Sequence, residues 1–282
     1  MPIQTVLLDK NFLHGRTIAD IQALAETHRL LMPCVLFYEM VSADEPKRSR
    51  LLTKFRRLEI PVHALKPLND LLKLEMMRLQ CCGRPSDHVE SIDAEVVRQA
   101  LEPGPHSPRA LDLLAEQADY LQAEVSSYRA IIAEVRKMFP QLAVGNDEGR
   151  RAFQETAESV VAEAARMRVF YESMSKVPSP GMFQAPPAHL VDENWACFRL
   201  MQVKLLFAIE HVHRIGTIDQ PAELSVKAFT RLEHDVLDQQ YLIQGVLEGA
   251  FATEEKKLQR WFRLLRPDGE LHCRPAFEDV QQ

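Results

Sequence analysis

The 282-residue sequence has few cysteines, and none of them shows the spacing of a metal site. The five cysteines are odd in number and include no Cys-x-x-Cys pair; they are Cys34, Cys81, Cys82, Cys197 and Cys273. This pattern argues against a disulfide framework and against a thiolate zinc site. Cys81 and Cys82 are interpreted as partly buried thiols, with redox activity as the alternative.

Long apolar runs and a surplus of positive charge are also lacking. No apolar run reaches the roughly 20 residues of a membrane span, and the first residues lack the basic head and apolar stretch of a signal peptide. We therefore expect a cytoplasmic protein with no membrane partner. The 34 Lys and Arg against 40 Asp and Glu give a formal charge of -6. Any binding of nucleic acid must then use a local basic patch.

The first 65 or so residues alternate between strand-like and helix-like patterns. Apolar strands are predicted at 5–8, 30–37 and 60–65, with helices at 17–27 and 43–58 between them. Alternation of this kind indicates a parallel sheet with right-handed crossovers, flanked by helices.

The middle of the chain reads as helix. From about 67 to about 232 the apolar residues recur at helical spacing, and Leu111, Leu121 and Val125 belong to the clearest stripe. A helix at 225–248, a short strand at 249–253 and a helix at 256–265 follow.

The predicted fold is therefore an α/β domain in two pieces, 1–66 and 226–282. A mostly α-helical insertion at 67–225 interrupts it.

Four acidic residues lie where strand-like runs end or helix-like runs begin: Asp9, Glu39, Asp238 and Glu255. The carboxyl ends of parallel strands meet at one edge of a sheet, so we expect these side chains to converge. Asp235, one turn from Asp238, offers another carboxylate. Each acid also has an ordinary alternative role, as a cap, a first-turn acid or a solvent-facing residue.

Three segments resemble the PIN-like nuclease family. They are Val6-Leu-Leu-Asp9-Lys-Asn11-Phe-Leu13, Met32-Pro33-Cys-Val-Leu-Phe-Tyr-Glu39, and the stretch from Asp238 through Gly249 and Thr253 to Glu255. The second resembles a strand followed by a Glu at the start of the next helix. In the third, Glu255 stands where the family usually has Asp, one methylene shorter.

The resemblance implies a divalent-metal-dependent nuclease acting on RNA, with single-stranded RNA as the expected partner. Carboxylates are hard ligands for Mg²⁺ or Mn²⁺, which activate water and neutralise phosphate charge. Asp9 and Asp238 would be direct ligands, and Glu39 and Glu255 would bind a second ion or orient water. Asp235 would compensate for the longer Glu255.

Polar and basic residues beside the acids are predicted to bind substrate. Asn11 and Thr253 would hydrogen-bond metal-bound water or a phosphate. A basic helix includes Lys47, Arg48, Arg50 and Lys54, which would guide a phosphate backbone. The alternative for this helix is a solvated charged face.

Other functions stay open at this point. One alternative is a catalytically inactive PIN-like scaffold that binds nucleic acid or a protein through its helical insertion. Another is a helical interaction protein without a sheet. Assembly into a homo-oligomer and control by a protein inhibitor are also open. A zinc site at His211 and His213 is disfavoured, because residues two apart on a helix point to different sides.

Overall fold

The computed structural model describes residues 4–43, 46–58, 61–90, 108–175, 185–215 and 226–274. By its internal contacts the chain divides into two compact units. The sheet unit contains residues 1–68, 84–117 and 244–282, and the helical unit contains residues 69–83 and 118–243. Unlike the predicted segments, this division assigns 84–117 to the sheet unit and 226–243 to the helical unit.

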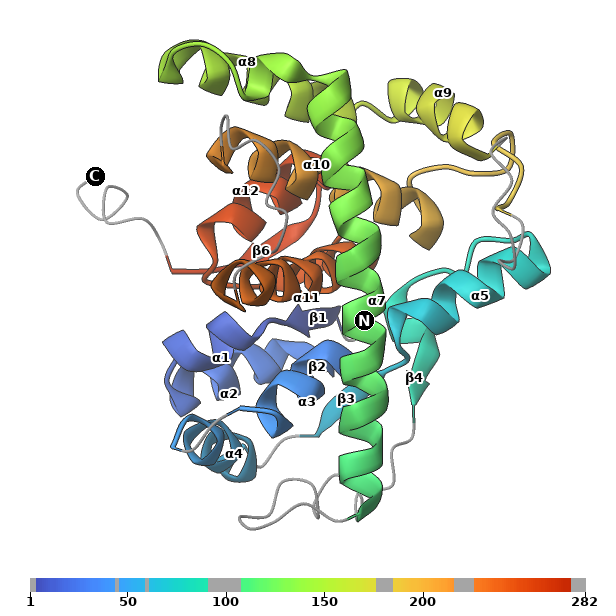
Figure 1. Cartoon of the computed structure of the whole chain (residues 1–282). Helices are drawn as coiled ribbons and strands as arrows, with labels where there is room; N and C mark the ends of the chain where they lie inside the picture. The colour runs from blue at the N-terminus through green and yellow to red at the C-terminus, as the bar shows by residue number, and fades with distance from the viewer. Residues whose placement is uncertain are drawn as a thin grey trace, which may run out of the picture. The chain divides into compact units, whose positions relative to one another are not determined.

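The sheet unit is built on five parallel strands (Figure 1). They are β1 (Gln4–Leu8), β2 (His28–Met32), β3 (Val62–Leu65), β5 (Ala250–Ala252) and β6 (Glu270–His272). The order across the sheet is β3-β2-β1-β5-β6, and the short strand β4 (Val89–Glu90) pairs antiparallel with β3 at one edge. The predicted α/β class with a parallel sheet is confirmed. β6 was not predicted.

The central strand β1 pairs with two strands that are far apart in sequence. Val6 is in register with Leu30 of β2, and Leu8 is in register with Ala252 of β5. Val6, Leu7 and Leu8 have no exposed surface. Burial of successive residues, which point to opposite faces, is typical of a parallel sheet covered on both sides.

Helices of the sheet unit connect the strands. They are α1 (Lys10–Gly15), α2 (Ile18–Thr27), α3 (Cys34–Val41), α4 (Lys47–Arg57) and α12 (Lys256–Leu265). A capping box begins α2: the backbone N–H of Asp20 donates to Thr17 Oγ1 at 3.1 Å, and the Thr17 N–H donates to Asp20 Oδ2 at 2.9 Å. The predicted helix at 17–27 is confirmed, whereas α1 was not predicted.

The predicted strand at 30–37 is wrong beyond Met32. Pro33 ends β2 and caps α3, with its carbonyl accepting from the Leu36 N–H at 2.9 Å. A continuous apolar run fits a buried helix as well as a buried strand, and the proline is the only local sign of the change. Glu39 consequently lies well inside α3 and not at the start of a helix. The helix predicted at 43–58 corresponds to α4, which is shorter because it begins at Lys47 and ends at Arg57.

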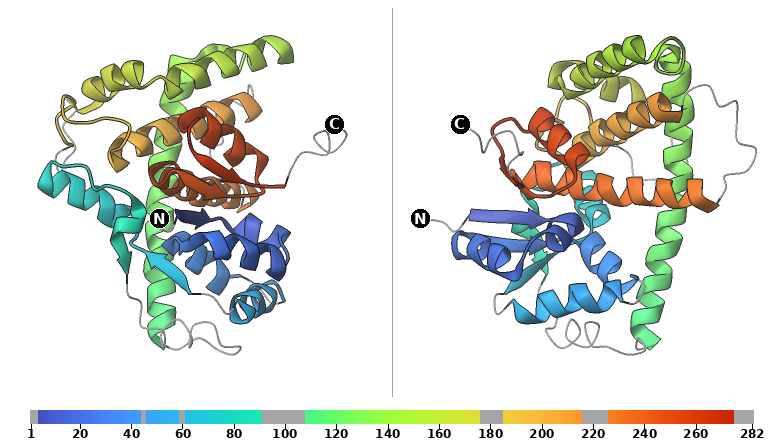
Figure 2. Two further views of the ribbon diagram at one scale, coloured as in Figure 1. Left: turned by 180° about the vertical axis from the view of Figure 1, so that it is seen from behind. Right: turned by 90° about the vertical axis from the view of Figure 1, so that its left-hand side faces the viewer.

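The helical middle of the chain is confirmed. It comprises α5 (Leu68–Arg78), α7 (Pro108–Met138), α8 (Asp147–Ala162), α9 (Ala164–Ser175), α10 (Ala196–Ile215) and α11 (Val226–Glu248), with 3₁₀ turns η1 (Pro85–His88) and η2 (Pro140–Leu142). Both α7 and α11 contribute residues to each unit, and α7 is one unbroken helix (Figure 2). Leu121 and Val125 of the predicted stripe are buried, but Leu111 is 53% exposed. No described helix combines the length and the apolar character that crossing a membrane requires.

A buried carboxylate organises part of the helical unit. Glu75 has no exposed surface, and it accepts from the backbone N–H groups of Ala196 at 2.7 Å and Cys197 at 2.9 Å. A negative charge at this place satisfies the first donors of α10. Nearby, burial raises the pKa of the Cys81 and Cys82 thiols. Thiolates are therefore disfavoured. The prediction of a partly buried thiol is confirmed for Cys82, whereas Cys81 is exposed.

Candidate carboxylate site at the sheet edge

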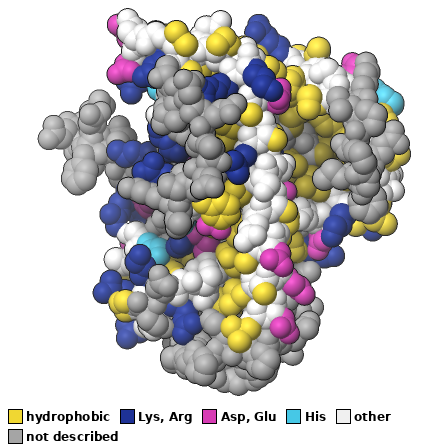
Figure 3. Space-filling view, in the orientation of Figure 1, with side chains coloured by type: hydrophobic (Ala, Val, Ile, Leu, Met, Phe, Trp, Pro, Cys, Tyr) yellow, Lys and Arg dark blue, Asp and Glu magenta, His cyan; other side chains and the backbone are white. Residues whose placement is uncertain are grey.

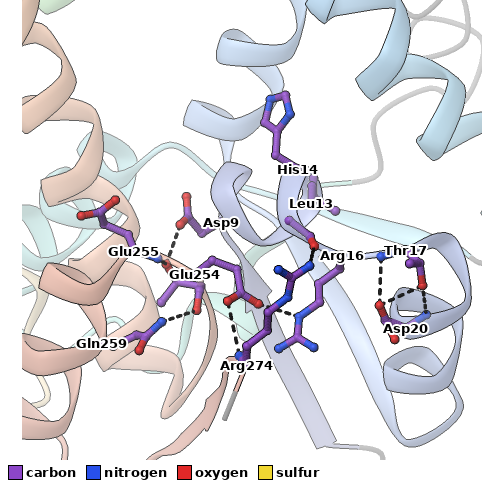
Figure 4. A network of polar contacts seen from close by, with 12 residues as sticks. Asp9, Leu13, His14, Arg16, Thr17, Asp20, Glu254, Glu255, Gln259 and Arg274 are labelled. Atoms are coloured by element: carbon purple, nitrogen blue, oxygen red, sulfur yellow. Dashed lines mark hydrogen bonds and ion pairs between the residues drawn. The ribbon is translucent and has the colours of Figure 1, made fainter. Parts of the chain in front are cut away.

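Asp9 lies directly after β1, at the carboxyl end of the central strand. Its backbone N–H donates to the carbonyl of Ala252 at 3.0 Å, so the residue continues the pairing between β1 and β5. The residue is 1% exposed. Its Oδ2 accepts a hydrogen bond of 2.6 Å from Thr253 Oγ1, and the backbone N–H of Asn11 also donates to the carboxylate. The carboxyl group is thus buried and hydrogen-bonded at the carboxyl end of β1 (Figure 4).

The surroundings of Asp9 hold its proton unusually tightly. The pKa of Asp9 is raised from 3.8 to about 7, chiefly by burial, and the charges of Glu39 and Glu255 contribute to this rise. The hydrogen bonds from Thr253 and Asn11 oppose this rise. A carboxyl group that titrates near neutrality is uncommon, and such groups gather at functional sites. A nearby cation would favour the ionised form.

Thr253 connects Asp9 to the start of α12. Its hydroxyl accepts the backbone N–H of Glu255 at 3.0 Å while it donates to Asp9. Gln259 Nε2 donates to the Thr253 carbonyl at 3.1 Å and holds the same turn from within α12. The Thr253 hydroxyl donates its proton to Asp9. The predicted role of Thr253 in binding metal-bound water or a phosphate stays a prediction.

Glu39 reaches this edge from α3, and a lysine accompanies it. Lys10 Nζ lies 2.8 Å from Glu39 Oε1, in an ion pair whose glutamate side chain is only 9% exposed. Lys10 directly follows Asp9, so it brings a positive charge among the acids. The sequence shows a lysine beside Asp9, but only the fold reveals its partner. We call Asp9, Glu39, Thr253 and Glu255 the Asp9 site.

Glu254 belongs to a second set of contacts. Arg16 Nε lies 2.5 Å from Glu254 Oε1, and the backbone N–H of Arg274 donates to Oε2 at 3.3 Å (Figure 4). Gly15 lets the chain pass close by, since a Cβ at this position would lie 3.1 Å from Glu254 Cγ. Of the adjacent pair, Glu254 is thus held by arginines, while the charge of Glu255 contributes to the raised pKa of Asp9.

Lys54, one of the predicted phosphate-binding residues, has a structural contact. Its Nζ donates to the backbone carbonyls of Leu13 at 2.6 Å, His14 at 3.2 Å and Arg16 at 2.6 Å, where α1 ends. A cation at this place neutralises the carbonyl end of a helix. The substrate role of Lys54 stays a prediction.

The remaining basic residues of α4 lie nearer to solvent. Lys47 and Arg50 are exposed, and Arg48 is half-buried. Lys and Arg side chains gather on the side of the molecule where α1, α2 and α4 lie (Figure 3). These residues stay predictions for phosphate binding, as does the exposed Asn11.

Asp235 and Asp238 lie on α11, in the helical unit. Asp235 is buried, with His211 Nδ1 and Arg214 each 3.7 Å from its Oδ2. Asp238 is half-buried. Participation of either residue in a metal site with Asp9 stays a prediction. The sheet unit itself brings together Asp9, Glu39 and Glu255.

A tighter group of metal-ligand side chains lies elsewhere in the sheet unit. Within the described ranges, one ligand atom from each of three such residues lies within 4.8 Å of the others only at His28, Glu270 and His272. The carboxylates of the Asp9 site are spaced more widely. Sequence reasoning missed this group, although Glu270-x-His272 on a short strand places both side chains on one face.

Comparison of the chain with protein-family models, with curated proteins and with solved structures found no match. The resemblance to PIN-like nucleases therefore depends on the motif residues and on the parallel sheet with its helical middle region.

Proposed function

We propose that this protein is a divalent-metal-dependent nuclease of the PIN-like kind, acting on single-stranded RNA. The observation that carries the proposal is the environment of Asp9. Its carboxyl group is 1% exposed and lies at the end of the central strand. The pKa of this group is raised to about 7, and the negative charges of two glutamates contribute to the rise. A bound cation would remove the electrostatic conflict among these groups.

The residues of the Asp9 site suit a hard cation. They offer carboxylate oxygens, the ligands that Mg²⁺ and Mn²⁺ prefer. Asp9 and Glu255 would hold the ion, and Thr253 orients the Asp9 carboxylate by its hydrogen bond of 2.6 Å. When bound, the ion supplies an activated water and neutralises charge on the phosphate.

Substrate binding is assigned to the basic residues of α4. Lys47, Arg48 and Arg50 would bind the phosphates of the RNA backbone without reading its sequence. The choice of RNA comes from the family resemblance, since these side chains would bind DNA phosphates as well.

The test is cleavage of labelled single-stranded RNA and DNA in Mn²⁺, in Mg²⁺ and in EDTA. We expect cleavage of RNA in Mn²⁺, none in EDTA, and at least a roughly 100-fold loss with Asp9→Asn. Asp119→Asn, at an exposed position of α7, is the matched control and should cleave normally. Absence of Mn²⁺-dependent cleavage, or full activity of Asp9→Asn, would reject the proposal.

A second candidate is a catalytically inactive scaffold that binds nucleic acid or a protein partner through its helical region. The Lys10–Glu39 ion pair at 2.8 Å favours it, because Glu39 has a partner without any metal. For this candidate we expect RNA to bind equally well in EDTA and in Mn²⁺, with no cleavage in either. Homo-oligomer formation and control by a protein inhibitor stay predictions.

A further inference from the structure

The tight group noted above, His28, Glu270 and His272, is hereafter the His-Glu-His cluster. His28 opens β2, directly after α2, while Glu270 and His272 flank Leu271 on β6. None of the three belongs to the Asp9 site. Two imidazoles and one carboxylate form a ligand set different from the all-oxygen set proposed there.

The register of the sheet places these three side chains on the same face. His28 is in register with Gln4 of β1, and Leu8, four residues on, is in register with Ala252 of β5. Ala252 is in turn in register with His272. Residues in register share a face, as do residues an even number apart on one strand. The whole cluster therefore lies on one face of the sheet, above the two strands, β1 and β5, that separate β2 from β6.

The distances within the His-Glu-His cluster are short. His28 Nε2 lies 3.2 Å from Glu270 Oε2, and His272 Nε2 lies 3.1 Å from Glu270 Oε1. The two rings meet edge to face with their centroids 4.8 Å apart. His28 is 5% exposed, whereas the Glu270 side chain is 44% exposed. The cluster is thus buried on the imidazole side and open to solvent at the carboxylate.

Hydrogen bonding orients the His28 ring as a ligand. Thr27 Oγ1 lies 2.8 Å from His28 Nδ1, and the Thr27 hydroxyl donates its single proton to the carbonyl of Leu24 at 3.1 Å. With the hydroxyl proton on that carbonyl, the Thr27 oxygen is free to accept a hydrogen bond from a protonated His28 Nδ1. In the neutral ring this leaves a lone pair on Nε2, the atom that faces Glu270. Support of a ring N–H by a neighbouring oxygen is typical of metal-binding histidines.

His272 faces the same carboxylate from β6. Its Nε2 is buried and lies 3.1 Å from Glu270 Oε1, without the geometry of a regular hydrogen bond. The Glu270 carboxylate thus lies between the two imidazole nitrogens, one at each of its oxygens. A cation bound among the two imidazole nitrogens and the carboxylate would interact favourably with all three groups.

We infer that the His-Glu-His cluster binds a Zn²⁺ ion, with water completing the coordination. Zinc binds imidazole nitrogen at about 2.0–2.1 Å and carboxylate oxygen at about 2.0–2.2 Å, so tetrahedral neighbours lie roughly 3.3 Å apart. The observed separations of 3.1 and 3.2 Å, each to a different oxygen of Glu270, are close to this value, and one ligand atom from each residue lies within 4.8 Å of the others. Imidazole nitrogens favour zinc over the magnesium or manganese proposed for the Asp9 site.

The test is metal binding by the full-length chain after treatment with EDTA. Titration with Zn²⁺ in a calorimeter should give one strong site, and Co²⁺ should give the visible absorption bands of a tetrahedral ion. We expect Glu270→Gln and His272→Ala to weaken Zn²⁺ binding at least 10-fold. Glu270→Gln changes a largely exposed carboxylate, so it decides the question if His272→Ala does not fold.

Two control variants separate this site from other sources of binding. His189→Ala removes an exposed histidine of the helical unit and should bind Zn²⁺ as the wild type does. Asp9→Asn should also bind normally, which distinguishes the cluster from the Asp9 site. Absence of a strong Zn²⁺ site in the wild type, or unchanged binding in Glu270→Gln, would overturn the inference. Because the readout is binding, it does not depend on whether the protein cleaves RNA.

Discussion

Replacing Asp9 by Asn should make the metal-free protein more stable at pH 8, even though it removes the central residue of the proposed site. Folding raises the pKa of Asp9 from 3.8 to about 7. The folded state therefore holds the proton more tightly than the unfolded state. The stability that this tighter proton binding gives the folded state is complete below pH 3.8 and is lost as the pH rises through about 7.

The magnitude follows from the same values. At about 1.4 kcal/mol per pKa unit, ionising Asp9 in the fold costs about 4 kcal/mol above neutrality. This is a large share of the roughly 5–15 kcal/mol that stabilises a typical domain. Asparagine keeps the shape and can accept the hydrogen bond from Thr253, but it carries no charge. We expect Asp9→Asn to gain up to about 4 kcal/mol at pH 8 and close to nothing at pH 4.

The assay is urea unfolding in EDTA at pH 4, 6 and 8, followed by far-UV circular dichroism. Subtracting the unfolding free energy of the wild type from that of the variant removes the contributions of the other titrating groups. Addition of Mn²⁺ at pH 8 should stabilise the wild type and leave Asp9→Asn unchanged. Asp119→Asn should show no pH-dependent difference. Equal destabilisation of Asp9→Asn at pH 4 and pH 8 would refute the reasoning.

Two further predictions concern the supports of this edge. Thr253→Val should destabilise the protein by about 1–3 kcal/mol, because Asp9 loses a donor and the Glu255 N–H loses its acceptor; Thr253→Ser, which keeps the hydroxyl, should restore most of this in urea unfolding. Lys54→Met should destabilise by about 1–3 kcal/mol through the carbonyls at the end of α1. Arg50→Gln should instead weaken RNA binding at unchanged stability, and equal stability losses for the two variants would contradict this division of roles.

Local signals explain the elements that could be predicted. The capping pair Thr17 and Asp20 marks the start of α2, and the amphipathic spacing of 256–265 gives α12 with its observed bounds. The position of Asp9 after an apolar strand follows from the same local pattern. Such signals depend on neighbouring residues alone, so a single sequence displays them.

The failures have a different physical origin. The run from Cys34 to Tyr38 is apolar throughout, so its periodicity does not separate a buried helix from a buried strand. Strand β6 is three residues long and is defined by its pairing with β5. The partner of Lys10 and the His-Glu-His cluster arise only when distant elements pack together. Contacts of this kind have no signature in one sequence.

The place of β5 beside β1 also bears on how the protein is made. β1 leaves the ribosome well before β5, because its partner Ala252 follows Leu8 by more than two hundred residues. At roughly 5–20 residues per second, one edge of β1 stays without its native neighbour for on the order of 10–50 s. An apolar strand with an open edge is prone to aggregation. Efficient folding would then depend on a chaperone, or on another segment of the chain, to shield the open edge of β1 until β5 is synthesised.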